Sequence, residues 1–181
     1  MPAISPRQRL IIDAALPFII MNPTATLNEI ASAANISKAT FHRHFDGRDT
    51  LFAAMAHYAL QSLRTALDQL PSMADPEARL RAMIAACTAQ GDKVYFLFYY
   101  PNNKAPQDFS ARIQTHLAPY YDTLSTLYAQ DYFNPKLPLD WLTNSLHTHL
   151  SIAWVQVHIG NVTLKEAIDL VWTHFCDGAK R

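Results

Sequence analysis

The chain has 181 residues, of which half are hydrophobic, and its 15 basic residues balance its 15 acidic residues. This length predicts one or two small domains with a substantial core, and a net charge of zero excludes a protein that coats nucleic acid nonspecifically. No run of about 18 apolar residues predicts a membrane span, and no signal peptide is indicated. Two cysteines far apart in the sequence favour buried thiols, so we expect a cytoplasmic protein.

The pattern of apolar residues predicts an all-α fold of about nine helices. Apolar side chains recur at helical spacing, prolines stand near helix starts, and the four glycines fall where a helical pattern ends or turns. No segment shows the sustained alternation of a strand. The expected helices span residues 6–21, 27–34, 38–44, 48–70, 76–90, 93–100, 107–130, 138–159 and 163–177.

The second expected helix has clear signals at both ends. Thr26 and Glu29 form a T-x-x-E capping box, and an apolar stripe follows them. Asn35 follows at a position where the chain must reverse, and asparagine tolerates the left-handed conformation better than other non-glycine residues. Ser37 is a favourable N-cap for the next helix. Residues 26–45 therefore predict two short helices joined by a tight turn.

The third expected helix separates apolar from polar side chains. Phe41 and Phe45 share one face at i, i+4 spacing, which leaves Lys38, Thr40 and the histidines on other faces. A helix whose first turn carries hydrogen-bond donors suits the DNA major groove, because recognition helices contact DNA mainly through their N-terminal residues. The pattern predicts a helix-turn-helix, although any pair of antiparallel helices has caps, a turn and apolar stripes.

Residues 7–52 resemble the N-terminal domain of the TetR family of bacterial transcriptional repressors. The family pattern is T-x-x-E-I-A-x-x-A, a turn, S-K-x-T followed by a hydrophobic and aromatic run, and a basic residue that opens a long fourth helix. This chain departs from it at Asn35, where the family has glycine, and at His42, where it has tyrosine. Pro17, inside the first expected helix, puts the geometry of that helix in doubt. The matching residues are Thr26, Glu29, Ile30, Ala31, Ala34, Ser37, Lys38, Thr40, Phe41, His44, Phe45, Arg48 and Leu51.

The resemblance implies a DNA-binding domain over residues 1–47 and a helical ligand-binding and dimerisation domain over residues 48–181. It implies a homodimer that binds a palindromic double-stranded operator, and a small apolar or aromatic effector that releases the operator. Base contacts are expected near the start of the third helix, and phosphate contacts from the basic side chains that follow. The predicted DNA-binding residues are Ser37, Lys38, Ala39, Thr40, His42, Arg43, His44 and Arg48.

Residues 94–100, VYFLFYY, are apolar and aromatic on every side, which predicts a helix that is buried all round or borders a cavity. Plain core is one interpretation. The wall of a ligand pocket is the other, supported by aromatic residues on other expected helices, Tyr120 among them. The predicted ligand-binding residues are Tyr58, Phe96, Tyr99, Tyr100, Tyr121 and Trp154.

The last two expected helices carry large side chains on more than one face, and the resemblance implies that these helices form the dimer interface. The residues concerned are Leu142, Leu146, Leu150, Trp154 and Trp172; the alternative is that they pack within their own chain.

Other classes of function have little support in the sequence. His147 and His149 lie on different faces of a helix, so we expect these histidines at a pocket or interface rather than at a metal. No enzyme motif appears, and neither an enzyme nor a cofactor is expected. Two alternatives stay open: an activator or a regulator that responds to a protein partner, and a helical enzyme or ligand carrier on the same fold without operator binding.

Overall fold

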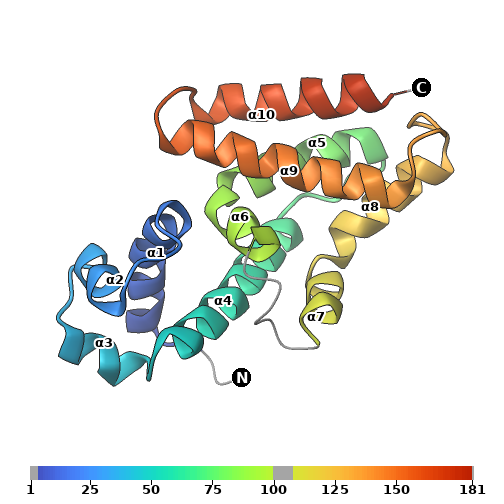
Figure 1. Ribbon diagram of the computed structural model, residues 1–181. Helices are drawn as coiled ribbons and strands as arrows, with labels where there is room; N and C mark the ends of the chain where they lie inside the picture. Colours follow the sequence, from blue (N-terminus) through green and yellow to red (C-terminus); the bar gives the residue numbers. More distant parts are fainter. Residues whose placement is uncertain (1–3, 100–107, 181) are drawn as a thin grey trace. The chain divides into compact units, whose positions relative to one another are not determined.

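The computed structural model describes residues 4–99 and 108–180, and the described chain is all-helical, as predicted (Figure 1). It forms two compact units, Met1–Ala59 and Leu60–Arg181. None of the helices in the described part combines the length and hydropathy needed to cross a bilayer. The helices are α1 (Pro6–Met21), α2 (Leu27–Ala33), α3 (Lys38–His44), α4 (Arg48–Asp68), α5 (Pro76–Ala89), α6 (Gly91–Tyr99), α7 (Phe109–His116), α8 (Ala118–Ala129), α9 (Leu139–His158) and α10 (Leu164–Trp172), followed by a π-helical turn, η1 (Thr173–Asp177).

Two expected helices differ from the structure. The single helix expected over residues 107–130 is two helices, α7 and α8, which meet at Leu117. Pro119 stands in the first turn of α8. Proline has no N–H and clashes with the preceding turn, so it begins a helix more readily than it continues one. The helix expected to end at residue 177 keeps its α-helical hydrogen bonding only to Trp172, and the described chain has ten α-helices rather than nine.

The N-terminal unit is built around α1, α2, α3 and the first part of α4. The helix α1 begins at a capping box formed by Ser5 and Gln8, and it continues through Pro17 as one helix. Its buried side chains include Ile12 and Leu16, which are fully buried. α1 packs against α2, and α2 packs against α3. The division between the units falls within α4, after Ala59. The boundary of the DNA-binding domain after residue 47 stays a prediction.

In the C-terminal unit, α9 is the helix around which the others pack. It contacts α5, α6, α8 and α10, and it lies beside α10 along its length (Figure 1). One side of α9 buries Leu142, Leu146 and Leu150 within the chain. The α6 helix comes so close to α9 that a Cβ added to Gly91 would lie 2.5 Å from the Cβ of Trp154. Glycine at this position therefore allows the two helices to touch.

Candidate nucleic-acid interface

The turn between α2 and α3 is a Schellman motif centred on Asn35. This residue has φ = 52°, the left-handed conformation expected from the sequence. The N–H of Ile36 donates to the carbonyl of Ala31 at 3.0 Å, and the N–H of Asn35 donates to that of Ser32 at 2.9 Å. These two bonds use carbonyl groups that would otherwise lack partners at the end of α2. Asparagine thus makes the turn that glycine makes in the family pattern.

The start of α3 carries a connected strip of polar side chains. The Ser37 hydroxyl accepts from the N–H of Thr40 at 3.1 Å, which confirms Ser37 as the N-cap. The Ser37 and Thr40 hydroxyl oxygens lie 3.0 Å apart, and the Arg43 guanidinium donates to the Thr40 hydroxyl at 3.2 Å. Spacing of three residues places all three side chains on one face of the helix. The strip presents hydroxyl and guanidinium donors, which suit both phosphate oxygens and base edges.

The opposite face of α3 is anchored in the core. Phe41 and Phe45 are fully buried, and their ring centroids lie 5.5 Å apart. Burying these rings fixes which side of the short helix faces solvent. Of the predicted DNA-binding residues, three are half-buried, namely Thr40, His44 and Arg48, and the others are exposed, namely Ser37, Lys38, Ala39, His42 and Arg43.

Polar contacts hold the end of α3 and the middle of α4 in place against α1 within the N-terminal unit. The side-chain amide of Gln8, which caps α1, also donates to the carbonyl of His44 at 3.1 Å. The Tyr58 hydroxyl donates to the Asp13 carboxylate at 3.1 Å. These contacts join segments 36 and 45 residues apart in the sequence. They fix the position of the recognition helix against α1, which a protein needs if it presents this helix to DNA.

Arg48 has contacts that its sequence position did not suggest. Its guanidinium donates to the carbonyls of Pro23, at 2.7 Å, and Ala25, and lies 4.6 Å from the centroid of the Phe52 ring. The side chain therefore ties the start of α4 to the connection between α1 and α2. Its predicted phosphate contact remains a prediction, and the structure adds a role in stability.

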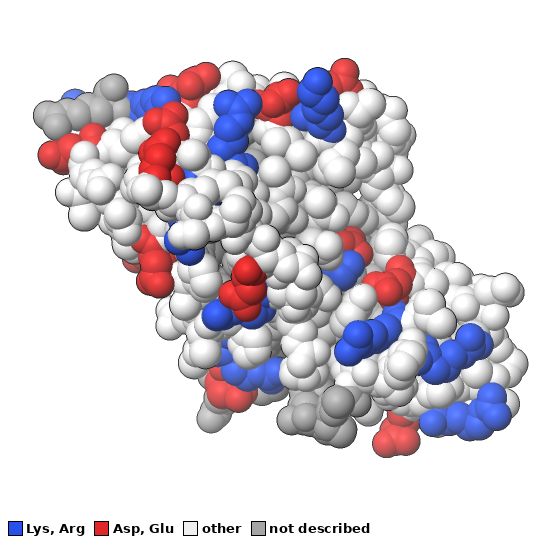
Figure 2. All heavy atoms as spheres, turned by 180° about the vertical axis from the view of Figure 1, so that it is seen from behind, with Lys and Arg blue, Asp and Glu red and all other residues white. Residues whose placement is uncertain are grey.

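The surface charge of the N-terminal unit is mixed. Figure 2 shows Lys and Arg side chains gathered at the lower right, with Asp and Glu side chains nearby. No large single-sign field covers this face. A tight complex with DNA would therefore require a few specific contacts rather than overall charge.

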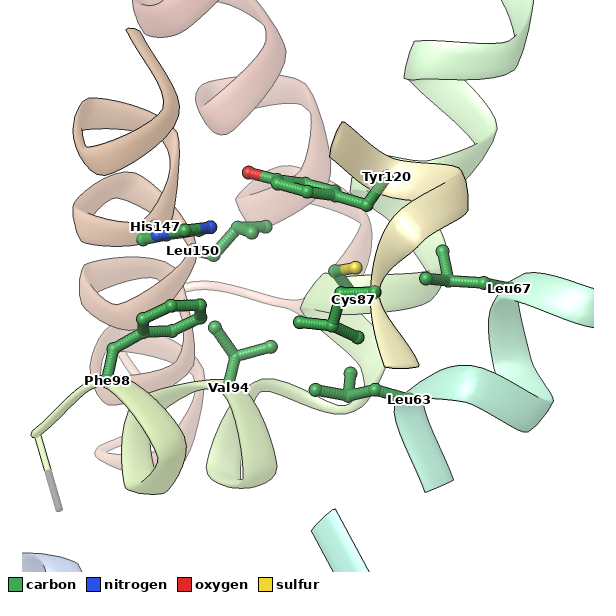
Figure 3. A pocket seen from close by; sticks show the side chains of 9 residues that line it. Leu63, Leu67, Cys87, Val94, Phe98, Tyr120, His147 and Leu150 are labelled. Carbon is green, nitrogen blue, oxygen red and sulfur yellow. The ribbon is translucent and has the colours of Figure 1, made fainter. Parts of the chain in front are cut away.

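The C-terminal unit contains a small cavity that the sequence did not locate (Figure 3). Its volume is about 10 Å³, near the minimum for a single water molecule. Val94 and Phe98 from the aromatic α6 line it, so this segment both fills the core and borders a cavity. Other lining residues are Leu63 and Leu67 of α4, Tyr120 of α8 and His147 of α9.

The cavity does not gather the side chains predicted to bind ligand. Tyr58 lies in the N-terminal unit, and Trp154 stacks on His158 with ring centroids 4.9 Å apart. Phe96 is buried in α6, and Tyr121 meets the edge of His147 at 6.2 Å. Tyr100 and the side chain of Tyr99 lie outside the described residues. These six assignments remain predictions. Phe98, in the segment interpreted as core or pocket wall, and His147, expected at a pocket or interface, were not among them, because helical periodicity does not give the depth of a cavity.

Burial keeps the polar groups of this region uncharged. Burial lowers the pKa of His147 to about 3 and raises that of Cys87, which also lines the cavity, to about 12. Both cysteines are free thiols. Among the described residues, no group of three or more potential metal ligands comes together.

A helix-turn-helix whose second helix has a buried aromatic face and an exposed polar face, joined to a helical unit, defines a class of DNA-binding regulators. Residues 11–55 match the sequence family described as "Bacterial regulatory proteins, tetR family". The matched residues cover most of α1, all of α2 and α3, and the start of α4.

Two characterised regulators align with parts of the chain. It is 30% identical over 105 residues to the HTH-type transcriptional repressor LfrR of Mycolicibacterium smegmatis, covering 58% of this chain and 56% of LfrR. It is 33% identical over 124 residues to the HTH-type transcriptional regulator NfxB of Pseudomonas aeruginosa, covering 65% of this chain and 64% of NfxB. The aligned segments thus span less than two thirds of either regulator. Both relatives are named as HTH-type transcriptional regulators.

The fold is also that of a solved regulator. The crystal structure of LfrR in complex with proflavine matches 96% of each chain with a TM-score of 0.77, at 23% sequence identity. At this identity the match establishes the all-helical fold of the described chain and not its ligand.

Proposed function

We propose that the chain is a transcriptional regulator that acts in the cytoplasm as a homodimer, binds a palindromic operator, and releases it when a small apolar or aromatic molecule binds the C-terminal unit. The observation that carries the proposal is the polar strip of Ser37, Thr40 and Arg43, with Ser37 and Arg43 exposed, on a helix whose other face is buried through Phe41 and Phe45. This arrangement places donors where base edges and phosphates would lie.

The surface of α9 and α10 supports the dimer. Four apolar side chains on or next to these helices are strongly exposed: Ile152 (56%), Ile159 (50%), Leu164 (41%) and Leu170 (47%). Between the helices runs a groove of about 240 Å³ that Ile152 and Leu170 help to line. Exposed apolar patches of this kind mark interaction sites. A second copy is the occupant we propose, because a palindromic operator requires two symmetry-related recognition helices.

The residues expected at the interface from sequence are mostly internal. Leu142, Leu146, Leu150 and Trp154 are buried within their own chain, and Trp172 is half-buried beside Arg81. The four side chains of α9 are buried because α5, α6 and α8 pack against this helix. The proposed dimer uses the other side of the same two helices.

Two features support an effector site in the C-terminal unit: the position of α4 and the aromatic residues that line the cavity. LfrR has been crystallised with proflavine, and an aromatic effector suits the aromatic segment of α6 in this chain. Leu63 and Leu67, which line the cavity, belong to the helix that begins at Arg48 beside the DNA-binding residues. A ligand that shifts α4 would change the spacing of two recognition helices in a dimer. By linkage, operator DNA must then weaken ligand binding by the same factor.

The test is a titration of the full chain against the DNA upstream of its own gene, followed by fluorescence anisotropy. We expect a saturable complex that outcompetes scrambled DNA and that weakens linearly in log affinity against log salt concentration. Added 2-quinolone, a small neutral aromatic molecule, is expected to release the operator. Binding of 2-quinolone without any sequence-specific DNA complex would instead favour a helical ligand carrier on the same fold.

A further inference from the structure

His147 and Tyr120 line the cavity of the C-terminal unit, and both carry unpaired polar atoms (Figure 3). His147 is only 6% exposed and Tyr120 only 2% exposed. Within the described part of the chain, both ring nitrogens of His147 and the hydroxyl of Tyr120 lack a hydrogen-bond partner. Buried polar atoms are almost always paired in native proteins, so unpaired atoms at one cavity indicate a missing partner.

The aromatic rings around these atoms give the cavity flat walls. Phe98 stacks on His147 with centroids 3.6 Å apart and planes 21° from parallel. Tyr120 lies 5.4 Å from His147, with planes 22° from parallel. Phe98 and His147 already cover each other's faces at this distance, so a planar aromatic guest would join the stack only by taking the place of one ring. The cavity holds at most about one water molecule as it stands, so such a guest must displace the surrounding side chains.

The residues that line the cavity favour an uncharged guest. Among the described residues that line the cavity there is no Lys, Arg, Asp or Glu. Burial keeps the Cys87 thiol and the nearby Tyr121 hydroxyl protonated, each with a pKa raised to about 12, and it keeps the imidazole neutral. An ion that entered would lose its hydration without gaining an opposite charge, and stacking on rings would offset only part of this cost.

We propose that this cavity binds a neutral, planar heteroaromatic molecule carrying both a hydrogen-bond donor and an acceptor, which pair with His147 and Tyr120 while its ring stacks against Phe98. A neutral imidazole offers one donor and one acceptor, and the tyrosine hydroxyl offers either. This ligand is the effector if the proposed regulatory function holds. Its binding is measured without DNA, so a failure of either proposal can be recognised separately.

The test compares three probes of similar shape by isothermal titration of the full chain near neutral pH. The probes are 2-quinolone, which is neutral with an N–H donor and a C=O acceptor, naphthalene, which has neither, and the 1-methylquinolinium cation. We expect 2-quinolone to bind at least about tenfold more tightly than either of the others, since they leave the polar atoms unpaired. Equal or tighter binding of naphthalene or of the cation, or no saturable binding of 2-quinolone, would overturn the proposal.

Two variants locate the site. His147→Phe keeps a flat ring without polar atoms, and Tyr120→Phe removes only one hydroxyl. Each is expected to weaken 2-quinolone binding about tenfold while leaving naphthalene binding unchanged or stronger. His149→Phe and Tyr128→Phe are the matched controls on the same two helices, outside the cavity lining. Unchanged 2-quinolone affinity in Tyr120→Phe and His147→Phe would overturn the assignment, and the circular dichroism melting curve of each variant verifies its fold.

Discussion

At the scale of single residues, the buried His147 imidazole makes stability depend on pH. Its pKa is lowered by burial from 6.5 to about 3 in the folded chain. Between these values the unfolded chain binds the additional proton, so the folded state loses stability as the pH falls below 6.5. Between about pH 7 and about pH 5 this group alone removes roughly 2 kcal/mol from the free energy of unfolding.

The His147→Phe variant tests this linkage. Urea denaturation across this pH range is expected to show a smaller loss of stability in the variant than in the parent chain, by roughly the same 2 kcal/mol. His149→Phe is the control, because this half-buried ring already bonds through Nδ1 to the carbonyl oxygen of Ser145. A pH dependence identical in His147→Phe and the parent would show that the imidazole is not held neutral.

Lys38 and Arg48 are both basic residues of the proposed interface, but their surroundings differ. Lys38 is exposed at the first position of α3, whereas Arg48 donates to backbone carbonyls in the α1–α2 connection. We expect Lys38→Ala to keep the melting temperature and to flatten the slope of log affinity against log salt concentration by about one. We expect Arg48→Ala to lower the melting temperature by several degrees, because the carbonyls of Pro23 and Ala25 lose a charged donor.

Calorimetric melting and salt titrations of both variants separate these roles. A lower melting temperature for Lys38→Ala, or an unchanged one for Arg48→Ala, would reverse the assignment. A flattened salt slope in Arg48→Ala would add the phosphate contact expected from its sequence position.

At the scale of helices, Gly91 sets how closely α6 approaches α9. Gly91→Ala would bring a methyl group within 2.5 Å of the Trp154 Cβ. The Cβ of a packed helical residue cannot swing away, so the helices must separate, at a cost of about 1–3 kcal/mol. Chemical denaturation measures this loss. Gly178→Ala is the control, because nothing lies within 4 Å of its added Cβ; equal stability of the two variants would contradict the close contact.

At the scale of the whole molecule, the proposed function depends on pairing two recognition helices. Leu170→Glu places a charge on the exposed apolar face of α10, and the isolated chain tolerates this because the side chain is 47% exposed. We expect sedimentation velocity to show monomers, and operator affinity to fall about tenfold or more, because half-sites are read one helical turn apart by a dimer. Ser125→Glu, an exposed site on α8, adds the same charge elsewhere. A Leu170→Glu dimer with full operator affinity would exclude this face.

The sequence by itself determined the helix-turn-helix. The Thr26–Glu29 capping box, the left-handed Asn35, the Ser37 cap and the buried pair Phe41 and Phe45 are all found as predicted. These features involve residues no more than four apart, and such short-range geometry follows from helical periodicity and backbone sterics. The all-helical class was predictable for the same reason.

Only the tertiary structure shows which residues the remaining side chains contact. It paired Arg48 with carbonyls more than twenty residues earlier in the chain. It brought His147, Tyr120 and Phe98 from three helices to one cavity, and it turned Leu142, Leu146 and Leu150 inward rather than toward a partner. A periodic pattern shows that a helix has an apolar face, but it does not say which other helix covers that face. Which helix covers that face depends on how all the helices pack together. The same packing decides whether an apolar side chain lies in the core, at a cavity or on the exposed surface.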